Sequence, residues 1–155
     1  MKLLVVAVGA RMPRWVDDAF SEYAKRMPRT MPLELVEIRP EPRSGGRTPA
    51  QLAAAEAGRI ERALPARCRR VALDERGREL ATPAFAKWLD EQKREGGDLA
   101  FIIGGPDGLA AQVKTGALLM RLSALTLPHA LARVVLAEQL YRASTILQGH
   151  PYHRG

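Results

Sequence analysis

The chain has 155 residues, of which 46% are hydrophobic and 26% charged, which predicts one globular domain and excludes fibrous and disordered classes. It carries 24 Lys and Arg against 17 Asp and Glu, so its formal charge of +7 favours an anionic partner such as RNA. A basic surface that only confers solubility is the alternative. The single cysteine, Cys68, excludes an internal disulfide, and no spacing of Cys and His predicts a metal site. Without a membrane-spanning run or a signal peptide, a cytoplasmic protein is expected.

Short apolar segments alternate along the chain with amphipathic segments, which is typical of an α/β domain with a parallel sheet covered by helices. Thr48-Pro49 and Thr82-Pro83 mark helix starts, because threonine caps a helix and proline suits its first turn. The stretch 40–49 is too rich in proline and glycine for a regular element, and we expect a mobile loop there. Strands are predicted at 2–8, 33–38, 70–73 and 99–103, and helices at 14–26, 49–64, 83–93 and 130–148.

Two phosphate-binding motifs are nearly present. Residues 108–115 have the length of a P-loop, but Val113 stands where the second glycine must be, and the segment has helical character. The turn 104–108 follows an apolar strand, but its glycine spacing differs from the dinucleotide fingerprint, and Pro106 removes a backbone donor. The sequence therefore predicts neither a nucleoside triphosphatase nor a dinucleotide-binding enzyme.

Three chain segments are expected to meet around one ligand: Leu73, Gly104-Gly105 and 123–128. Each ends a strand or an apolar run, and ligands of open parallel sheets bind outside the carboxyl ends of strands. Leu125 and Leu127 would hold an aromatic ring while the peptide groups around them form hydrogen bonds, which suits adenine better than a polyphosphate. Alternatively, 122–127 is another core strand and the two glycines form only a turn.

The helix predicted at 130–148 carries apolar residues on two faces, so we expect it to be buried on more than one side. In so small a protein, one of these sides is expected to meet a second copy of the chain about a two-fold axis. Glu138 and Arg142 are spaced i, i+4 on the remaining face. This spacing is typical of an ion pair along a helix. If the helix lies beside a pocket, the alternative is that Arg142 binds a phosphate. The polar residues 152–154 follow this helix, and such a terminus is usually frayed.

Six segments of the chain together carry a resemblance to a known family. They are Met1 to Gly9, Met12 to Val16, Ile103 to Leu109, Leu122 to His129, Glu138 to Ala143 and His150 to Arg154. With these segments the chain resembles, from end to end over residues 1–155, the SPOUT-class ribosomal RNA methyltransferases that methylate N3 of a pseudouridine in 23S rRNA. The resemblance implies a homodimeric SPOUT methyltransferase fold with a C-terminal trefoil knot, S-adenosylmethionine as methyl donor, and a target base in helix 69 of assembled 70S ribosomes.

The resemblance places the cofactor at the same strand ends that the residues alone indicate. It implies that the binding positions are Leu73, Gly104, Gly105, Ser123, Ala124, Leu125, Thr126, Leu127 and Pro128. The loop 40–49, in contrast, looks particular to this chain.

Transfer of a methyl group from a sulfonium to N3 requires that N3 is aligned with the methyl group and that the N3 proton is removed. We expect His153 or Glu138 to help remove that proton, and Arg154, Tyr152 and Arg142 to position phosphate, base or developing charge. Because the tail follows the buried helix, it could reach the pocket of the partner protomer and make a composite site there. His129 is expected chiefly to order the loop after Pro128, with a direct catalytic role as the alternative.

Two other functions are compatible with parts of this pattern. A basic dimer could dock on ribosomal RNA without chemistry, and salt-sensitive RNA binding does not distinguish it from an enzyme. A related knotted methyltransferase could act on tRNA, but the chain has no separate RNA-binding domain.

Overall fold

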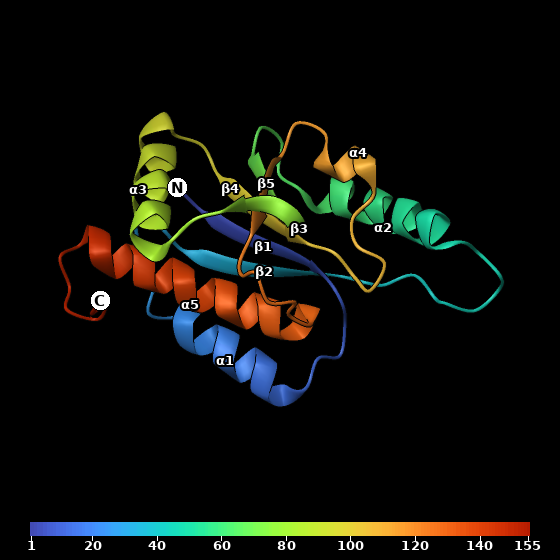
Figure 1. Ribbon diagram of the computed structural model, residues 1–155, viewed down its shortest axis with the longest axis horizontal. Coiled ribbons are helices and arrows are strands. Elements are labelled where there is room, and N and C mark those ends of the chain that lie inside the picture. The colour runs from blue at the N-terminus through green and yellow to red at the C-terminus, as the bar shows by residue number, and fades with distance from the viewer.

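The computed structural model describes residues 1–155, which form a five-stranded parallel sheet with helices on both faces (Figure 1). The strands lie in the order β2-β1-β4-β3-β5. They are β1 (Leu3–Val8), β2 (Leu33–Ile38), β3 (Arg69–Glu79), β4 (Leu99–Ile103) and β5 (Leu118–Arg121). The helices are α1 (Arg14–Ala24), α2 (Pro49–Ala63), α3 (Thr82–Glu95), α4 (Ala111–Lys114) and α5 (His129–Leu147). The predicted α/β fold with a parallel sheet is confirmed.

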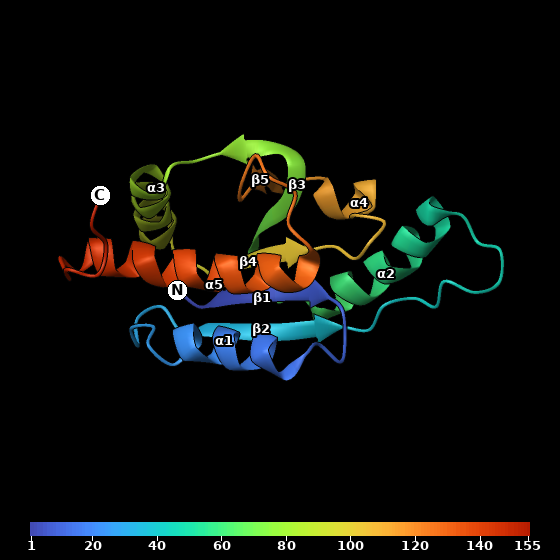
Figure 2. The same cartoon turned by 60° about the horizontal axis from the view of Figure 1, so that its bottom comes forward.

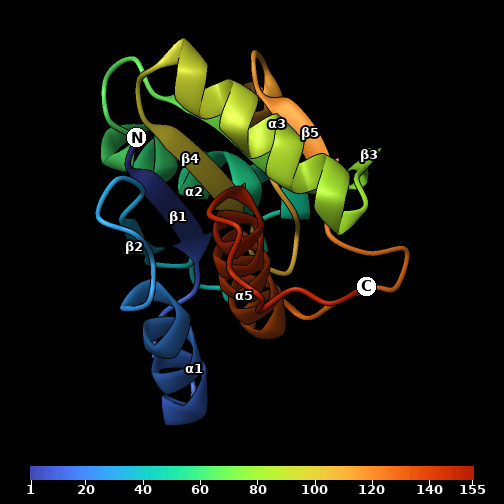
Figure 3. The ribbon, with the colours of Figure 1, turned by 90° about the vertical axis from the view of Figure 1, so that its left-hand side faces the viewer.

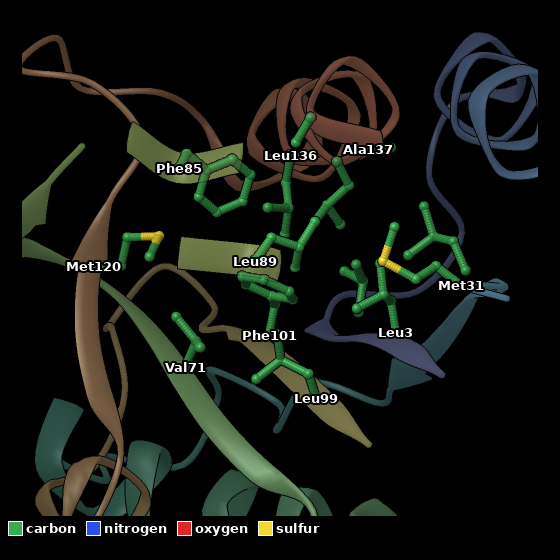
Figure 4. Close-up of a cluster of buried hydrophobic side chains, with 14 of the residues drawn as sticks. Leu3, Met31, Val71, Phe85, Leu89, Leu99, Phe101, Met120, Leu136 and Ala137 are labelled. Atoms are coloured by element: carbon green, nitrogen blue, oxygen red, sulfur yellow. The ribbon is translucent and has the colours of Figure 1, made fainter. Parts of the chain in front are cut away.

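The central strands β1 and β4 are buried along their whole length, because helices cover both faces of the sheet. Alternate side chains of β1 therefore enter two different clusters. Leu3 and Val5 belong to the larger cluster under α1, α3 and α5, which also contains Phe101 (Figure 4). Leu4 and Val6 belong to a smaller cluster under α2 and α4.

Helix α5 lies between α1 and α3 on one face of the sheet (Figure 2). The predicted burial on more than one side is confirmed, and it includes Leu136, Leu140 and Ala143. The expectation that a second copy of the chain covers one of these sides is not needed, because α1 and α3 of the same chain already do so. Burial of α5 is therefore no argument for a dimer. No helix has the length and apolar character needed to cross a membrane.

Three elements near the pocket differ from the sequence expectations. Strand β3 continues to Glu79, six residues beyond the predicted end, because its polar second half pairs with β5 after a register shift between Leu73 and Arg78. The strand alternative for 122–127 is wrong, since β5 ends at Arg121 and those residues form a loop. The helical stretch expected at 108–115 is reduced to the four residues of α4.

Candidate active site

A pocket of about 950 Å³ lies at the carboxyl ends of β3 and β4. The loop 122–128 and the first residues of α5 complete its wall. All nine residues that the sequence predicts as cofactor-binding line this pocket, and His129 lines it as well. The structure thus brings together residues that are separated by up to 59 positions in the chain. The volume of the pocket lies in the range of small-molecule sites.

The turn after β4 owes its shape to glycine. The backbone N–H of Gly108 donates to the carbonyl of Gly105 at 3.0 Å, and Gly108 has a φ of +75° that L residues rarely adopt. A Cβ on Gly104 would lie 2.8 Å from the carbonyl carbon of Gly108. The chain therefore folds tightly back on itself at the pocket edge. A side chain at position 104 would push the two ends of the turn apart.

The opposite wall, residues 123–127, presents backbone and an uncovered apolar side chain. Outside the helices and strands, no backbone to backbone hydrogen bond involves these five residues. The Leu125 N–H donates only to the hydroxyl of Ser123, at 3.0 Å. Leu125 is 76% exposed, so its apolar side chain is open to a ligand in the pocket. This wall has peptide groups and apolar surface available for a flat ligand with polar edges.

An ion pair that the sequence reasoning missed also lines the pocket. Lys114 of α4 places its ammonium 2.5 Å from the carboxylate of Asp74, which directly follows Leu73 in β3. The hydrogen bond from Lys114, followed by that from the Arg76 N–H, holds the pKa of Asp74 below its usual value. The position of Asp74 at the end of a predicted strand indicated that it could lie at the pocket, but nothing in the sequence indicated that Asp74 pairs with Lys114.

The predicted catalytic residues of the last helix and the tail form a second cluster, in which Glu138 is the hub. One oxygen of Glu138, Oε1, accepts hydrogen bonds from Arg142 at 2.6 Å and from the Tyr152 hydroxyl at 3.1 Å. Nη1 of Arg142 lies 3.4 Å from Nδ1 of His153. Burial and the Glu138 carboxylate raise the pKa of Tyr152, so this hydroxyl remains a donor at neutral pH.

The terminus is docked and not frayed, because aromatic and cationic side chains hold it. In Figure 3 the chain that follows α5 folds back across the end of that helix. The rings of Tyr141 and Tyr152 meet edge to face with centroids 4.8 Å apart. The Arg26 guanidinium lies 4.4 Å from the Tyr141 ring centroid and donates to its hydroxyl at 3.0 Å. Arg154 is exposed and forms no ion pair. Neither Arg26 nor Tyr141 was predicted as a site residue.

Within one chain, the two groups of predicted site residues do not meet. None of the residues Glu138, Arg142, Tyr152, His153 and Arg154 lines the pocket. At 1.5 Å per residue, Glu138 and Arg142 lie about 13 and 20 Å along α5 from its first residue, which is at the pocket. Only one predicted catalytic residue, His129, is next to the predicted cofactor positions. Burial and then the charge of Arg133 lower the pKa of His129, which favours its neutral form.

Most basic residues of the last third are already paired, contrary to the simple picture of a cationic face. Lys114 pairs with Asp74, Arg121 with Glu79, Arg133 with Glu37, and Arg142 with Glu138. Arg133 is 0% exposed. The arginines of the β3 region divide in the same way, since Arg69 and Arg70 are paired whereas Arg67, Arg76 and Arg78 form no ion pair. The cations free for an anionic partner are thus fewer than the composition suggests.

The chain has no group of three or more His, Cys, Asp or Glu residues placed to hold a metal ion.

The chain is similar to known proteins along almost its whole length. A family model described as a predicted SPOUT methyltransferase matches residues 1–153. The chain is 62% identical over 155 residues to the Ribosomal RNA large subunit methyltransferase H of Ralstonia nicotianae, covering 99% of both chains. It is 60% identical to the protein of the same name from Bordetella avium, again over 99% of both.

Solved structures show the same fold at low sequence identity. A probable methylase family protein from Haemophilus influenzae superposes with a TM-score of 0.55 at 14% identity, over 99% of this chain and 70% of that one. TrmJ from Z. mobilis gives a TM-score of 0.52 at 19% identity, over 97% of this chain and 72% of that one.

Proposed function

Because this chain belongs to the SPOUT methyltransferase family, we propose that it transfers a methyl group from S-adenosylmethionine to N3 of a pseudouridine in 23S rRNA. The proposed target lies in helix 69 of the assembled 70S ribosome, which would place the protein in the cytoplasm. The observation that carries the proposal is the convergence of all nine implied cofactor residues on one pocket. Near-complete coverage of relatives named Ribosomal RNA large subunit methyltransferase H supports the RNA class of substrate.

The pocket residues fit an adenosine cofactor. The free peptide groups of 123–127 match the polar edge of adenine, and the exposed Leu125 side chain offers its ring an apolar contact. The turn at Gly104 and Gly105 brings backbone close to the rest of the ligand without side chains between them. When bound, S-adenosylmethionine supplies a methyl group that is already activated on a sulfonium.

Removal of the N3 proton is assigned to His153. Glu138 is the weaker candidate, because its Oε1 already accepts from both Arg142 and Tyr152. A guanidinium can only donate, so the approach of Arg142 to Nδ1 of His153 favours the tautomer with its proton on Nε2. Nδ1 then holds the free electron pair, and at 3.4 Å the contact with Arg142 is loose enough for the N3–H to replace it. Tyr152 and Arg142 position this histidine, and Arg154 is left to contact RNA.

A homodimer reconciles the two groups of site residues. The tail cluster lies about 13 to 20 Å along α5 from the pocket of its own chain. A two-fold arrangement would allow the tail of one protomer to complete the pocket of the other. The trefoil knot implied by the family also stays a prediction.

The test is transfer of labelled methyl from S-adenosylmethionine to 70S ribosomes that lack this modification, followed by mass spectrometry of the nucleosides. N3-methylpseudouridine in 23S rRNA is the expected product. Methylated tRNA with unmodified ribosomes would favour the tRNA enzyme. Salt-sensitive ribosome binding with no transfer and no cofactor binding would favour a non-enzymatic binding module. Equal rates on free 23S rRNA and on 70S particles would remove the requirement for an assembled ribosome.

A further inference from the structure

A buried carboxylate on α2 is the starting point. Glu56 is only 2% exposed and lies in a helix whose neighbouring buried residues are apolar. An uncompensated charge there would strongly destabilise the fold. Its Oε2 accepts the backbone N–H of Glu41 at 2.9 Å and Nη1 of Arg43 at 2.9 Å. The proline-rich loop 40–49 thus supplies both partners of this buried group.

Arg43 also reaches the turn that borders the pocket. Its Nη2 lies 2.9 Å from Oδ2 of Asp107, and its Nε lies 3.2 Å from the same oxygen. The guanidinium therefore bridges a carboxylate fixed in the core and a carboxylate on the turn. In Figure 1 the chain between β2 and α2 passes beside the chain that follows β4, as the ion pair between Arg43 and Asp107 requires.

The glycine at position 105 makes room for this bridge. A Cβ on Gly105 would lie 3.2 Å from a methyl of Val8, 3.5 Å from Nη2 of Arg43 and 3.6 Å from Oε1 of Glu56. The ion pair thus packs directly against the backbone of the turn. Asp107 and Gly105 line the large pocket, whereas Arg43 lines a separate hollow of about 270 Å³ behind the turn.

The loop itself is held in place by further charges. Glu41 pairs with Arg47 at 2.6 Å and with Arg59 of α2 at 2.6 Å. Nη1 of Arg43 donates to the Glu41 carbonyl at 2.6 Å, which restrains the direction of the guanidinium. A loop expected to be mobile is consequently fixed to α2 on one side and to the pocket turn on the other.

We infer that Arg43 is a positioning residue for the cofactor: by bridging Glu56 and Asp107 it holds the Gly104–Gly108 turn in the conformation that binds S-adenosylmethionine. The inference rests on the proposed function for the identity of this ligand. Arg43 acts from behind the turn, outside the pocket, so it contributes by preorganisation and not by ligand contact. If the turn is not ordered before the ligand binds, ordering it costs conformational entropy, and this cost lowers the affinity for the ligand.

The experiment combines hydrogen exchange of the ligand-free protein with calorimetric binding of S-adenosylhomocysteine. In Arg43→Met we expect the amides of residues 104, 105 and 107–109 to exchange about tenfold faster and the ligand to bind about tenfold more weakly. Arg43→Lys should fall between, because one ammonium cannot reproduce the fork of the guanidinium. Arg47→Met is the matched control, since Arg47 belongs to the same loop but contacts only Glu41, and it should bind like the wild type.

Arg43→Met leaves Glu56 as a buried charge, so a second variant separates positioning from stability. In Arg43→Met/Glu56→Gln the buried charge is removed, and we expect stability to recover while ligand affinity stays about tenfold reduced. Asp107→Asn should add no further loss to Arg43→Met if the two act as one unit. Wild-type exchange of 104–109 in Arg43→Met, or unchanged affinity, would overturn the inference. Failure of the wild type to bind the ligand would instead contradict the proposed function, and the exchange data would still test the bridge.

Discussion

Gly77 of β3 lies against the backbone of Met120 of β5, so that a Cβ on Gly77 would come within 2.5 Å of both the nitrogen and the carbonyl carbon of Met120. This contact falls at the register shift between Leu73 and Arg78, where the polar half of β3 rejoins β5. The glycine thus permits two backbones to approach closely beside the pocket.

The first prediction concerns this contact. Gly77→Ala forces the two strands apart, and we expect it to destabilise the protein by about 1–3 kcal/mol, as overpacking does elsewhere. Urea unfolding measures the change. Gly58→Ala is the control, because a Cβ there would meet only the flexible end of Arg62 at 3.7 Å, inside α2. It should be neutral or stabilising by up to about 1 kcal/mol. Equal effects of the two substitutions would contradict this reading of Gly77.

The second prediction concerns the exposed leucine of the pocket wall. Leu125→Ala should weaken S-adenosylhomocysteine binding by about tenfold, because burial of a leucine side chain by a ligand is worth about 1.5–3 kcal/mol. The melting temperature should not change, since this side chain is 76% exposed in the free protein. Leu147→Ala removes another partly exposed leucine, at the far end of α5, and should leave binding unchanged. Unaltered binding by Leu125→Ala would contradict contact between Leu125 and the cofactor.

The third prediction tests whether the tail serves the partner's pocket. Gly104→Val damages the pocket, because a side chain there meets the Gly108 backbone, and His153→Ala removes the proposed base. Each variant alone should be inactive. A refolded equal mixture should regain about a quarter of wild-type methyl transfer, since half of the dimers then contain one intact pocket beside one intact tail. No recovery in a mixture shown to contain mixed dimers would mean that pocket and tail of the same chain work together.

The fourth prediction concerns acid stability. Lys114 holds the pKa of Asp74 below its usual value, so the pair contributes stability that is present above the unfolded-state pKa, about 3.9. This contribution is lost as the pH falls through the lower folded-state pKa, because Asp74 must then bind a proton. Lys114→Met should therefore be less stable than the wild type at pH 6 but should lose less stability on acidification. Urea unfolding at pH 6 and at about pH 3 measures both, with the unpaired Lys87→Met as control.

A difference between variants at pH 6 that persists unchanged at the lower pH would contradict this assignment to Asp74. The result would then point to packing of the Lys114 side chain between β3 and α4 as its contribution.

Much of the fold follows from local patterns. The strands Leu33–Ile38 and Leu99–Ile103 were predicted with their observed bounds, and α2 starts at Pro49, as the pair Thr48-Pro49 predicts. The second half of β3 was not predictable, because Asp74 to Glu79 is polar and pairs with β5 only in the assembled sheet. Propensity does not report a partner strand that lies about 40 residues further along the chain.

The same distinction holds for the candidate site, in which local features could be predicted and long-range contacts could not. Glycines at 104 and 105, the apolar run ending at Pro128 and the i, i+4 spacing of Glu138 and Arg142 can be read from the sequence, since each depends on near neighbours. The contact of Arg26 with Tyr141, against which the tail docks, could not be predicted, because the two residues are 115 positions apart in the chain.

By itself the sequence determined the alternation of strands and helices and the family resemblance, and it predicted nine of the residues that line the pocket, because periodicity, turn residues and motifs are local properties. Only the tertiary structure decided which charges are neutralised, that α1 and α3 bury α5, and that Arg43 joins Glu56 to Asp107. These are contacts across long sequence separations, and their energies depend on burial and geometry that exist only once the chain has folded.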